Sequence, residues 1–221
     1  MTEPKTKTKG WRGSRAAWLS VAKDILIDQG ESAVTVQAMA KRLKLSRTSF
    51  YWFFQDRQDV MQALLDLWAD TNTKPIQDAS NAYAETMVEA VLNVTYTLIS
   101  EVEYDPRFDA AIRGWAIQSS EVNARLVAED EKRVDAIRQM MIRHGFNQVE
   151  ADVRAHAIYL VQLGYTSMQI KEDWENRIAR VPYYMRTLAG FSPTEAEFAR
   201  FRAKFTHLDS ANEQGSYGKN L

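Results

Sequence analysis

The sequence predicts an all-α protein in which a small basic head is followed by a larger helical body. Apolar residues recur at intervals of three and four along most of the chain, which is typical of amphipathic helices. No segment of useful length alternates apolar and polar residues in the manner of a half-buried strand. Glycines and prolines follow many of the periodic segments and divide the chain into about nine or ten helices.

Composition excludes several classes of protein. The chain has 221 residues, of which 45% are hydrophobic, and this is enough for one large domain or two modest ones that share a core. It contains no cysteine, which excludes disulfide frameworks, thiol catalysis and cysteine-based zinc sites. Its first ten residues carry no apolar run, and no stretch approaches the roughly 18 apolar residues of a membrane span. We therefore expect a cytoplasmic protein.

Charge is distributed unevenly along the chain. Residues 1–60 hold eleven basic and six acidic residues, whereas the remainder carries a net charge of -6. A basic head on an acidic body is typical of a nucleic-acid-binding domain joined to a domain that does not bind nucleic acid. Chance clustering of charge is the alternative at this point.

The head is predicted at residues 13–72, after a disordered basic arm at residues 1–12. It contains four short amphipathic helices, and the first of them ends at Gly30. A tight corner at Lys44 separates the second helix from the third, which extends to about residue 53. Hydroxyl and carboxylate side chains that can cap exposed N–H groups mark where the helices begin. These positions are Thr35, Ser46 and Asp56, and the helical spacing of the first helix begins at Ser14.

The body is predicted at residues 75–208, because Pro75 marks the exit from the head. A disordered polar tail follows at residues 209–221. A helix with two apolar faces is expected first, so that it is buried on both sides. The expected helices of the body span residues 79–103, 121–144, 148–171, 174–189 and 194–207, with a further element beginning at Pro106.

A helix, a tight turn and a short helix form the arrangement that places a recognition helix in the major groove of DNA. Phe50 and Phe54 lie four residues apart in the third helix, so both should point inward against the second helix. The remaining side chains then face outward and offer donors, acceptors and large amphipathic rings. They are Arg47, Thr48, Ser49, Tyr51 and Trp52.

The stretch from Arg15 to Val60 resembles the tetracycline-repressor (TetR) family of bacterial regulators, since the spacing of its motif agrees over four consecutive helices. The matching residues are Arg15, Trp18, Leu19, Ala22, Ile25, Leu26, Gly30, Thr35, Val36, Met39, Ala40, Leu43, Leu45, Ser46, Phe50, Tyr51, Phe54 and Arg57. Three positions depart from the pattern. The usual turn glycine is Lys44, a common histidine is Phe53, and the lysine that opens the fourth helix is Arg57.

The resemblance implies the roles of eight DNA-binding residues. Phosphate contacts are implied for Thr35 and Tyr51, and Arg57 would hold the DNA backbone. Candidates for contacts with base edges are Gln37, Arg47, Thr48 and Trp52, and Ser49 could serve either purpose. Solvation of a surface without a partner is the alternative for each residue.

The resemblance also implies a homodimer in which helices 148–171 and 174–189 pair across a two-fold axis as a four-helix bundle. The residues of the body support this pairing, because the apolar run from Ile158 to Tyr165 cannot face a single core. Burial of that run by the C-terminal helix of the same chain is the alternative.

A cavity for a small-molecule effector between the middle helices is a further family expectation, with no other cofactor and no metal. The residues proposed to line it are Tyr83, Met87, Tyr96, Phe108, Trp115, Met140, Met141 and Trp174. Each of them could instead belong to an ordinary core. Arg113 is a candidate partner for a carboxylate on the ligand, and structural roles are expected for His144 and His156.

Together these features predict a ligand-responsive, DNA-binding transcriptional regulator: a helix-turn-helix head with a C-terminal effector and dimerisation domain. We expect a repressor that a small molecule releases from a palindromic operator. An activator, or a helical protein–protein adaptor with a degenerate head, is the alternative. An enzyme is not expected, since the sequence contains no phosphate-binding loop, metal-ligand cluster or nucleophile–base set.

Overall fold

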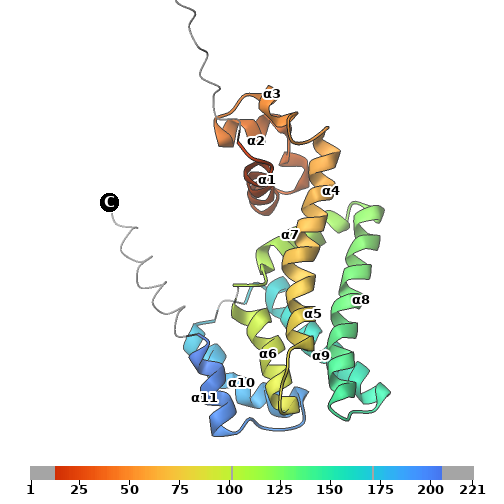
Figure 1. Cartoon of the computed structure of the whole chain (residues 1–221), viewed down its shortest axis with the longest axis vertical. Coiled ribbons are helices and arrows are strands. Elements are labelled where there is room, and N and C mark those ends of the chain that lie inside the picture. Colours follow the sequence, from red (N-terminus) through yellow and green to blue (C-terminus); the bar gives the residue numbers. More distant parts are fainter. Residues whose placement is uncertain (1–12, 101, 171, 206–221) are drawn as a thin grey trace, which may run out of the picture.

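A computed structural model describes residues 13–100, 102–170 and 172–205, and within them every regular element is a helix (Figure 1). The predicted all-α class is therefore confirmed. The basic arm at residues 1–12 and the tail at 209–221 lie outside the described residues. The elements are α1 (Arg15–Gln29), η1 (Glu31–Ala33), α2 (Val36–Leu43), α3 (Arg47–Phe50), α4 (Arg57–Trp68), η2 (Ala69–Thr73), α5 (Lys74–Asn81), α6 (Met87–Ser100), α7 (Pro106–Ala116), α8 (Ser120–Arg143), α9 (Gln148–Ser167), α10 (Trp174–Leu188) and α11 (Glu195–Ala203).

The three predicted caps of the head are confirmed, and Ser14 caps α1 in the same way. Each side chain accepts a hydrogen bond from the backbone N–H three residues further along, at distances between 2.9 and 3.3 Å. Gly30 ends α1 with a φ of 83°, a conformation that favours glycine. Local side-chain chemistry thus sets the helix boundaries of the head. The capping residues are Ser14, Thr35, Ser46 and Asp56.

Helices α4 and α5 form one continuous rod through the π-helical segment η2 (Figure 1). Pro75, interpreted from the sequence as the exit from the head, therefore lies inside this rod. Proline cannot donate to the helix and its ring crowds the carbonyl one turn earlier. The helix widens just before it, where the Lys74 N–H bonds to the Ala69 carbonyl five residues back. The predicted boundary between head and body thus falls within an unbroken helix.

The expected helix over residues 79–103 was also wrong, because the chain leaves the helix at Ala82 and re-enters it at Met87. The cause is a capping arrangement in which Thr86 Oγ1 accepts from the Glu89 N–H at 3.1 Å. The Glu89 carboxylate in turn accepts from the Glu85 N–H at 3.0 Å. A separate helix α6 begins there.

Two hydrophobic cores lie at opposite ends of this rod. The head core joins α1, α2, α3 and α4, and it also receives Phe108 and Ile112 of α7 and Val122 and Leu126 of α8. The body core joins α5, α6, α9, α10 and α11 with the C-terminal half of α8. Residues that the sequence assigned to the body thus complete the core of the head, and α7 and α8 connect the two.

Candidate DNA-binding surface, ligand pocket and the junction between them

The corner between α2 and α3 is a left-handed turn at Lys44, with φ 55° and ψ 39°. The Leu45 N–H reaches back to the Ala40 carbonyl at 3.0 Å and closes the end of α2. Lys44 therefore adopts the conformation that the more usual glycine would take. The left-handed conformation costs a non-glycine residue about 1–2 kcal/mol of conformational strain. The turn keeps this conformation at Lys44 despite that cost.

The inner face of the short helix α3 is aromatic. Phe50 and Phe54 are buried as predicted, with ring centroids 5.5 Å apart. The Trp18 ring of α1 meets Phe50 edge-on at 5.5 Å. The α-helix ends at Phe50, earlier than predicted, and a tight turn carries the chain on to half-buried Phe53. This packing fixes which side chains α3 presents to solvent.

Six of the eight predicted DNA-binding residues lie on the exposed surface of the head. Tyr51 and Trp52 are 61% and 63% exposed, a high value for large aromatic side chains. Their contact with DNA stays a prediction. The six exposed residues are Thr35, Gln37, Arg47, Thr48, Tyr51 and Trp52.

Ser49 and Arg57 lie differently from the prediction. Ser49 is buried, and its hydroxyl lies 3.0 Å from the hydroxyl of Ser46, so it faces inward rather than toward DNA. The Arg57 guanidinium donates to the Val34 carbonyl at 2.7 Å and to the Glu31 carbonyl at 2.9 Å, and it pairs with the Glu31 carboxylate. Arg57 therefore ties the start of α4 to the turn after α1.

The structure does not bring the eight predicted pocket residues together. Met87, Met140 and Met141 are buried in the body core, where they pack against other apolar side chains. Phe108 is fully buried in the head core, and the Lys23 ammonium lies 4.9 Å from its ring centre. These four residues therefore belong to the hydrophobic cores, which was the stated alternative to lining a ligand cavity.

The other four are scattered. Tyr83 lies in the connection between α5 and α6 and is 89% exposed. Tyr96 lies beside Lys204 in an open groove, and Trp115 borders α1. The side chain of Trp174 lies outside the described part of the structure. The prediction that these residues form one shared ligand site is therefore wrong.

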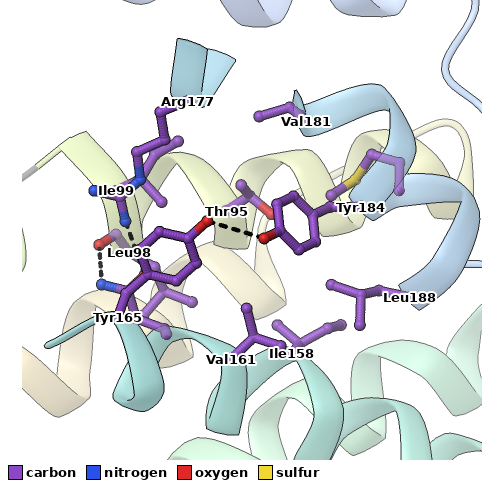
Figure 2. Close-up of a pocket in the computed structure, with 12 residues that line it drawn as sticks. Thr95, Leu98, Ile99, Ile158, Val161, Tyr165, Arg177, Val181, Tyr184 and Leu188 are labelled. Atoms are coloured by element: carbon purple, nitrogen blue, oxygen red, sulfur yellow. Dashed lines mark hydrogen bonds between the residues drawn. The ribbon is translucent and has the colours of Figure 1, made fainter. Parts of the chain in front are cut away.

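A different cavity, of about 60 Å³, lies between α6, α9 and α10 (Figure 2). Its walls are aliphatic over most of their area, and polar groups gather at one end. Periodicity could not identify it, because its lining comes from three helices that are distant in sequence. The aliphatic residues are Leu98, Ile99, Ile158, Val161, Val181, Met185 and Leu188, and the polar ones are Thr95, Gln162, Tyr165, Arg177 and Tyr184.

Two tyrosines face each other across the polar end of this cavity, with their hydroxyl oxygens 2.9 Å apart (Figure 2). The hydrogen bond with Tyr165, together with burial, raises the pKa of Tyr184. Arg177 donates to the side-chain oxygen of Gln162 at 3.2 Å and lies 5.0 Å from the ring centre of Tyr165. The Gln162 amide donates in turn to the Leu98 carbonyl at 3.0 Å. This end can therefore both donate and accept hydrogen bonds.

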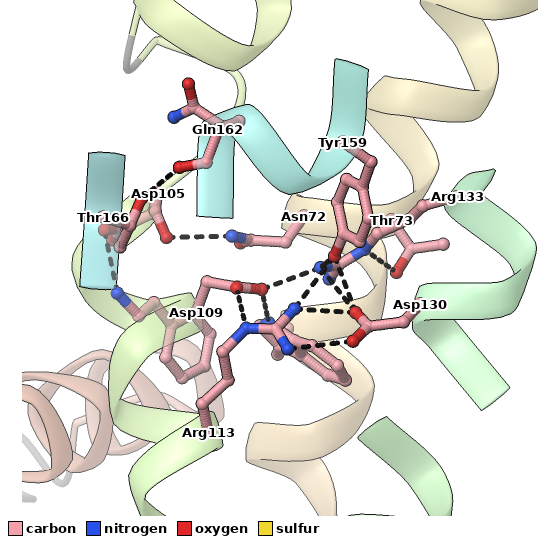
Figure 3. A network of polar contacts seen from close by, with 12 residues as sticks. Asn72, Thr73, Asp105, Asp109, Arg113, Asp130, Arg133, Tyr159, Gln162 and Thr166 are labelled. Atoms are coloured by element: carbon pink, nitrogen blue, oxygen red, sulfur yellow. Dashed lines mark hydrogen bonds and ion pairs between the residues drawn. The ribbon is translucent and has the colours of Figure 1, made fainter. Parts of the chain in front are cut away.

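A buried polar junction lies between the two cores (Figure 3). Asp109 of α7 and Arg133 of α8 are both fully buried and pair at 2.8 Å. The Trp68 indole of α4 donates to the same carboxylate at 2.9 Å, and Arg133 lies over the Trp68 ring. Burial alone would raise the pKa of Asp109, but the charges of Arg133 and Arg113 outweigh it and lower this pKa. The buried carboxyl is therefore ionised.

Arg113 and Tyr159 extend the junction toward α9 (Figure 3). Arg113 pairs with Asp109 at 2.7 Å and holds Asp130 through two hydrogen bonds of 2.8 and 2.7 Å. The carboxylates that it meets thus belong to the protein, and its proposed role toward a ligand was wrong. The Tyr159 hydroxyl accepts from Arg133 at 2.7 Å and donates to Asp130 at 2.6 Å. Ile158, its neighbour, lines the cavity.

The outer face of α9 carries a stripe of exposed apolar residues. Val149, Val153, Leu160 and Met168 are 75%, 63%, 57% and 74% exposed and follow helical spacing. Ile158 and Tyr159 point inward, so the apolar run does face two directions, as predicted. Helix α11 packs on α6 and leaves the stripe uncovered within the described part of the chain.

No group of three or more acidic or histidine residues among those described is arranged to hold a metal ion. Within the same residues no helix is long and apolar enough to cross a membrane. His156 bonds through its ring Nδ1 with the Asp152 carbonyl at 2.9 Å, which is a structural contact within α9.

Comparisons with known proteins agree with this architecture. Residues 19–64 match the family model described as bacterial regulatory proteins, tetR family. None of the curated proteins matches the chain.

Solved structures of similar fold cover most of the chain at low identity. AmtR from Mycobacterium smegmatis has a TM-score of 0.60 and 15% identity, over 90% of this chain and 97% of that one. PfmR from Thermus thermophilus, a TetR-family transcriptional regulator, has a TM-score of 0.61 and 18% identity, over 80% and 99%. AibR, solved with isovaleryl coenzyme A and operator DNA, has a TM-score of 0.53 and 17% identity, over 71% and 86%.

Proposed function

We propose that this chain, whose residues 19–64 match the tetR family of bacterial regulatory proteins, is a regulator of that family: a homodimeric repressor that a small molecule releases from a palindromic operator. The observation that carries DNA binding is the exposed polar and aromatic surface around α3. An aromatic inner face holds α3 rigidly, so its outward side chains are already placed for a groove.

Arg47 is the residue that we expect to contribute most to operator specificity. It lies at the first position of α3 and is exposed, and it has no carboxylate partner among the described residues. An arginine that donates two hydrogen bonds to a guanine contributes about 1–3 kcal/mol of discrimination. Thr35 and Tyr51 flank it as candidates for phosphate contacts.

The uncovered apolar stripe on α9 supports a dimer. Large exposed side chains at helical spacing are what a paired helix buries in a four-helix bundle. Two heads spaced about 34–36 Å apart would read successive major grooves of a palindromic site. A Leu160→Asp substitution should therefore convert a dimer to a monomer in sedimentation experiments. Val127→Asp, at a 51% exposed position on α8, should not do so.

The response to an effector is a shift between two conformations. The cavity between α6, α9 and α10 is the proposed effector site. Helix α9 also carries Tyr159, which reaches the polar junction where α4 and α7 meet. A ligand that lowers operator affinity about a hundredfold must supply nearly 3 kcal/mol of coupling. The structure of AibR with both a small molecule and DNA supports a fold of this kind accommodating both.

Gel-shift experiments on DNA from upstream of its own gene would test the proposal. We expect salt-sensitive, sequence-selective binding that Arg47→Ala weakens about tenfold or more. Arg202→Ala is the matched control, since Arg202 is exposed on α11 at the opposite end of the molecule (Figure 1). The absence of a shift across many promoter fragments would favour the protein–protein adaptor instead. A reporter gene that falls silent without the protein would indicate an activator.

A further inference from the structure

Arg177 is an exception among the arginines that are at least half-buried. Six other arginines of this kind each lie within 4.0 Å of a carboxylate oxygen. Arg177 pairs with no carboxylate among the described residues, although it lines the cavity between α6, α9 and α10. The six paired arginines are Arg57, Arg113, Arg125, Arg133, Arg138 and Arg154.

The surroundings of Arg177 do not replace a carboxylate. Its side chain meets the neutral amide oxygen of Gln162, at a long 3.2 Å, and the ring of Tyr165. Glu172, in the segment before α10, pairs with Arg180 at 2.7 Å instead. A guanidinium presents five N–H donors in a fixed fork that matches a carboxylate, and one neutral acceptor uses few of them. This site therefore retains most of its capacity to bind an anion.

We propose that the cavity between α6, α9 and α10 binds a small organic carboxylate with a compact apolar body, and that Arg177 receives the carboxylate group. This rests on the proposed effector-responsive function and names the chemical class of the effector. The aliphatic walls, which include Ile158, Val181 and Leu188, enclose the apolar body. The carboxylate takes the place of the Gln162 oxygen at the guanidinium.

The size of the cavity limits the ligand. A water molecule occupies about 10–15 Å³ on this measure, so 60 Å³ corresponds to roughly four to six atoms of comparable size. Short aliphatic acids match this volume, whereas longer chains and simple aromatic acids require the surrounding side chains to move. A coenzyme A thioester is far larger, and its nucleotide portion would have to remain outside.

The tyrosine pair at the same end favours an anion over a cation. Tyr165 and Tyr184 share a hydrogen bond of 2.9 Å, and this bond together with burial raises the pKa of Tyr184, so the Tyr184 hydroxyl stays neutral. Neutral hydroxyls can donate to a second carboxylate oxygen, whereas a cationic ligand would meet the positive charge of Arg177. The polar end is therefore selective for negative charge.

The test is calorimetry on the full-length protein without DNA. The probes are aliphatic carboxylates of four to eight carbons, benzoate and phenylacetate, each paired with the amide of the same skeleton. We expect at least one acid to bind, and its amide to bind at least about tenfold more weakly. Arg177→Gln should abolish binding and Arg177→Lys should weaken it, because lysine keeps the charge but loses the fork. Arg180→Gln, on the same helix but paired with Glu172, should leave binding unchanged.

Three results would overturn the proposal: no acid in the series binds, an acid and its amide bind equally, or Arg177→Gln retains full affinity. Circular dichroism confirms that each variant is folded. Because these measurements contain no DNA, they are independent of the gel-shift experiment. Operator binding without acid binding would refute the carboxylate site alone, and acid binding without operator binding would refute the repressor alone.

Discussion

Arg133 and Arg177 represent two opposite ways of placing a guanidinium inside this protein. Arg133 is fully buried, and it meets Asp109, Thr73 and Tyr159 at 2.7–3.0 Å. Arg177 is half-buried beside a cavity and meets one neutral amide at 3.2 Å. Both arginines carry the same charge, so the difference lies in what their neighbours supply. Arg133 already has a carboxylate partner within the protein, although one of its terminal nitrogens makes no hydrogen bond, whereas Arg177 can still accept an anion from outside.

The two sites also differ in how they are connected. Side chains from α4, α7, α8 and α9 converge on Arg133, so any movement there disturbs both cores. Arg177 is held by α9 alone, through Gln162 and Tyr165. We therefore expect substitutions in the junction to affect folding strongly, and substitution of Arg177 to affect mainly ligand binding.

The largest effect is expected from Asp109→Ala. It removes the carboxylate that pairs with Arg133 and Arg113 and accepts from Trp68, and it leaves Arg133 buried with its principal counter-charge gone. Removing one partner of a buried ion pair costs about 3–5 kcal/mol. Urea unfolding at one fixed protein concentration measures this cost. Asp66→Ala, which removes an exposed carboxylate on α4, is the control. A similarly small loss of unfolding free energy in both variants would contradict the interpretation that Asp109 is the buried counter-charge of Arg133.

The second effect concerns pH. The charges of Arg133 and Arg113 overcome the opposing effect of burial, so the pKa of Asp109 lies below its ordinary value of 3.8. A depressed folded-state pKa stabilises the protein fully above the unfolded value, and this contribution is lost as the pH falls through the folded value. Between pH 4 and pH 2 the wild type should therefore lose more unfolding free energy than Asp109→Asn. If the unfolding free energies of the two proteins fell in parallel over this pH range, the Asp109 carboxylate would contribute nothing to the acid sensitivity of the fold.

Tyr159→Phe should cost less, about 2 kcal/mol, because it removes one hydroxyl but no charge. That hydroxyl accepts from Arg133 and Arg113 and donates to Asp130. Thermal unfolding reports the loss, and Tyr183→Phe, at a 66% exposed ring, gives the baseline for removing a phenol oxygen. Equal melting temperatures for the two variants would mean that Tyr159 does not stabilise the junction.

The smallest change in stability is expected for Arg177→Gln. It removes one long hydrogen bond and one contact with an aromatic ring, together worth about 1 kcal/mol or less. Urea unfolding in the absence of any ligand is the measurement. A loss comparable to that of Asp109→Ala would make Arg177 a structural residue and would remove the distinction between the two sites.

The sequence predicted the head better than the body, and the reason is the range of the interactions. Caps at Ser14, Thr35, Ser46 and Asp56 act within three residues, so they can be read locally. Thr86 and Glu89 form the same kind of local signal, and attention to them would have placed the start of α6. Ser49 was misplaced because it lies three residues after the cap residue Ser46, and its hydroxyl meets the hydroxyl of that cap.

The cavity could not be predicted because its polar end depends on how α9 and α10 pack together. Tyr165 and Tyr184 meet only after the chain has turned between these helices. Arg113 and Arg177 also look alike in sequence, since each follows an aspartate four residues earlier. Only the packing shows that Asp109 and Asp130 satisfy the first, whereas no described carboxylate satisfies the second.

The unbroken rod from Arg57 to Asn81 has a mechanical consequence. At 1.5 Å per residue it is roughly 37 Å long, and it spans from the head into the body core. Arg57 at its upper end is hydrogen-bonded to the turn after α1, so the head moves together with the rod when the rod tilts. A tilt of about 5° at its lower end displaces the upper end by about 3 Å over this length. The rod is thus long enough for a small side-chain movement in the body to displace the head by several ångströms.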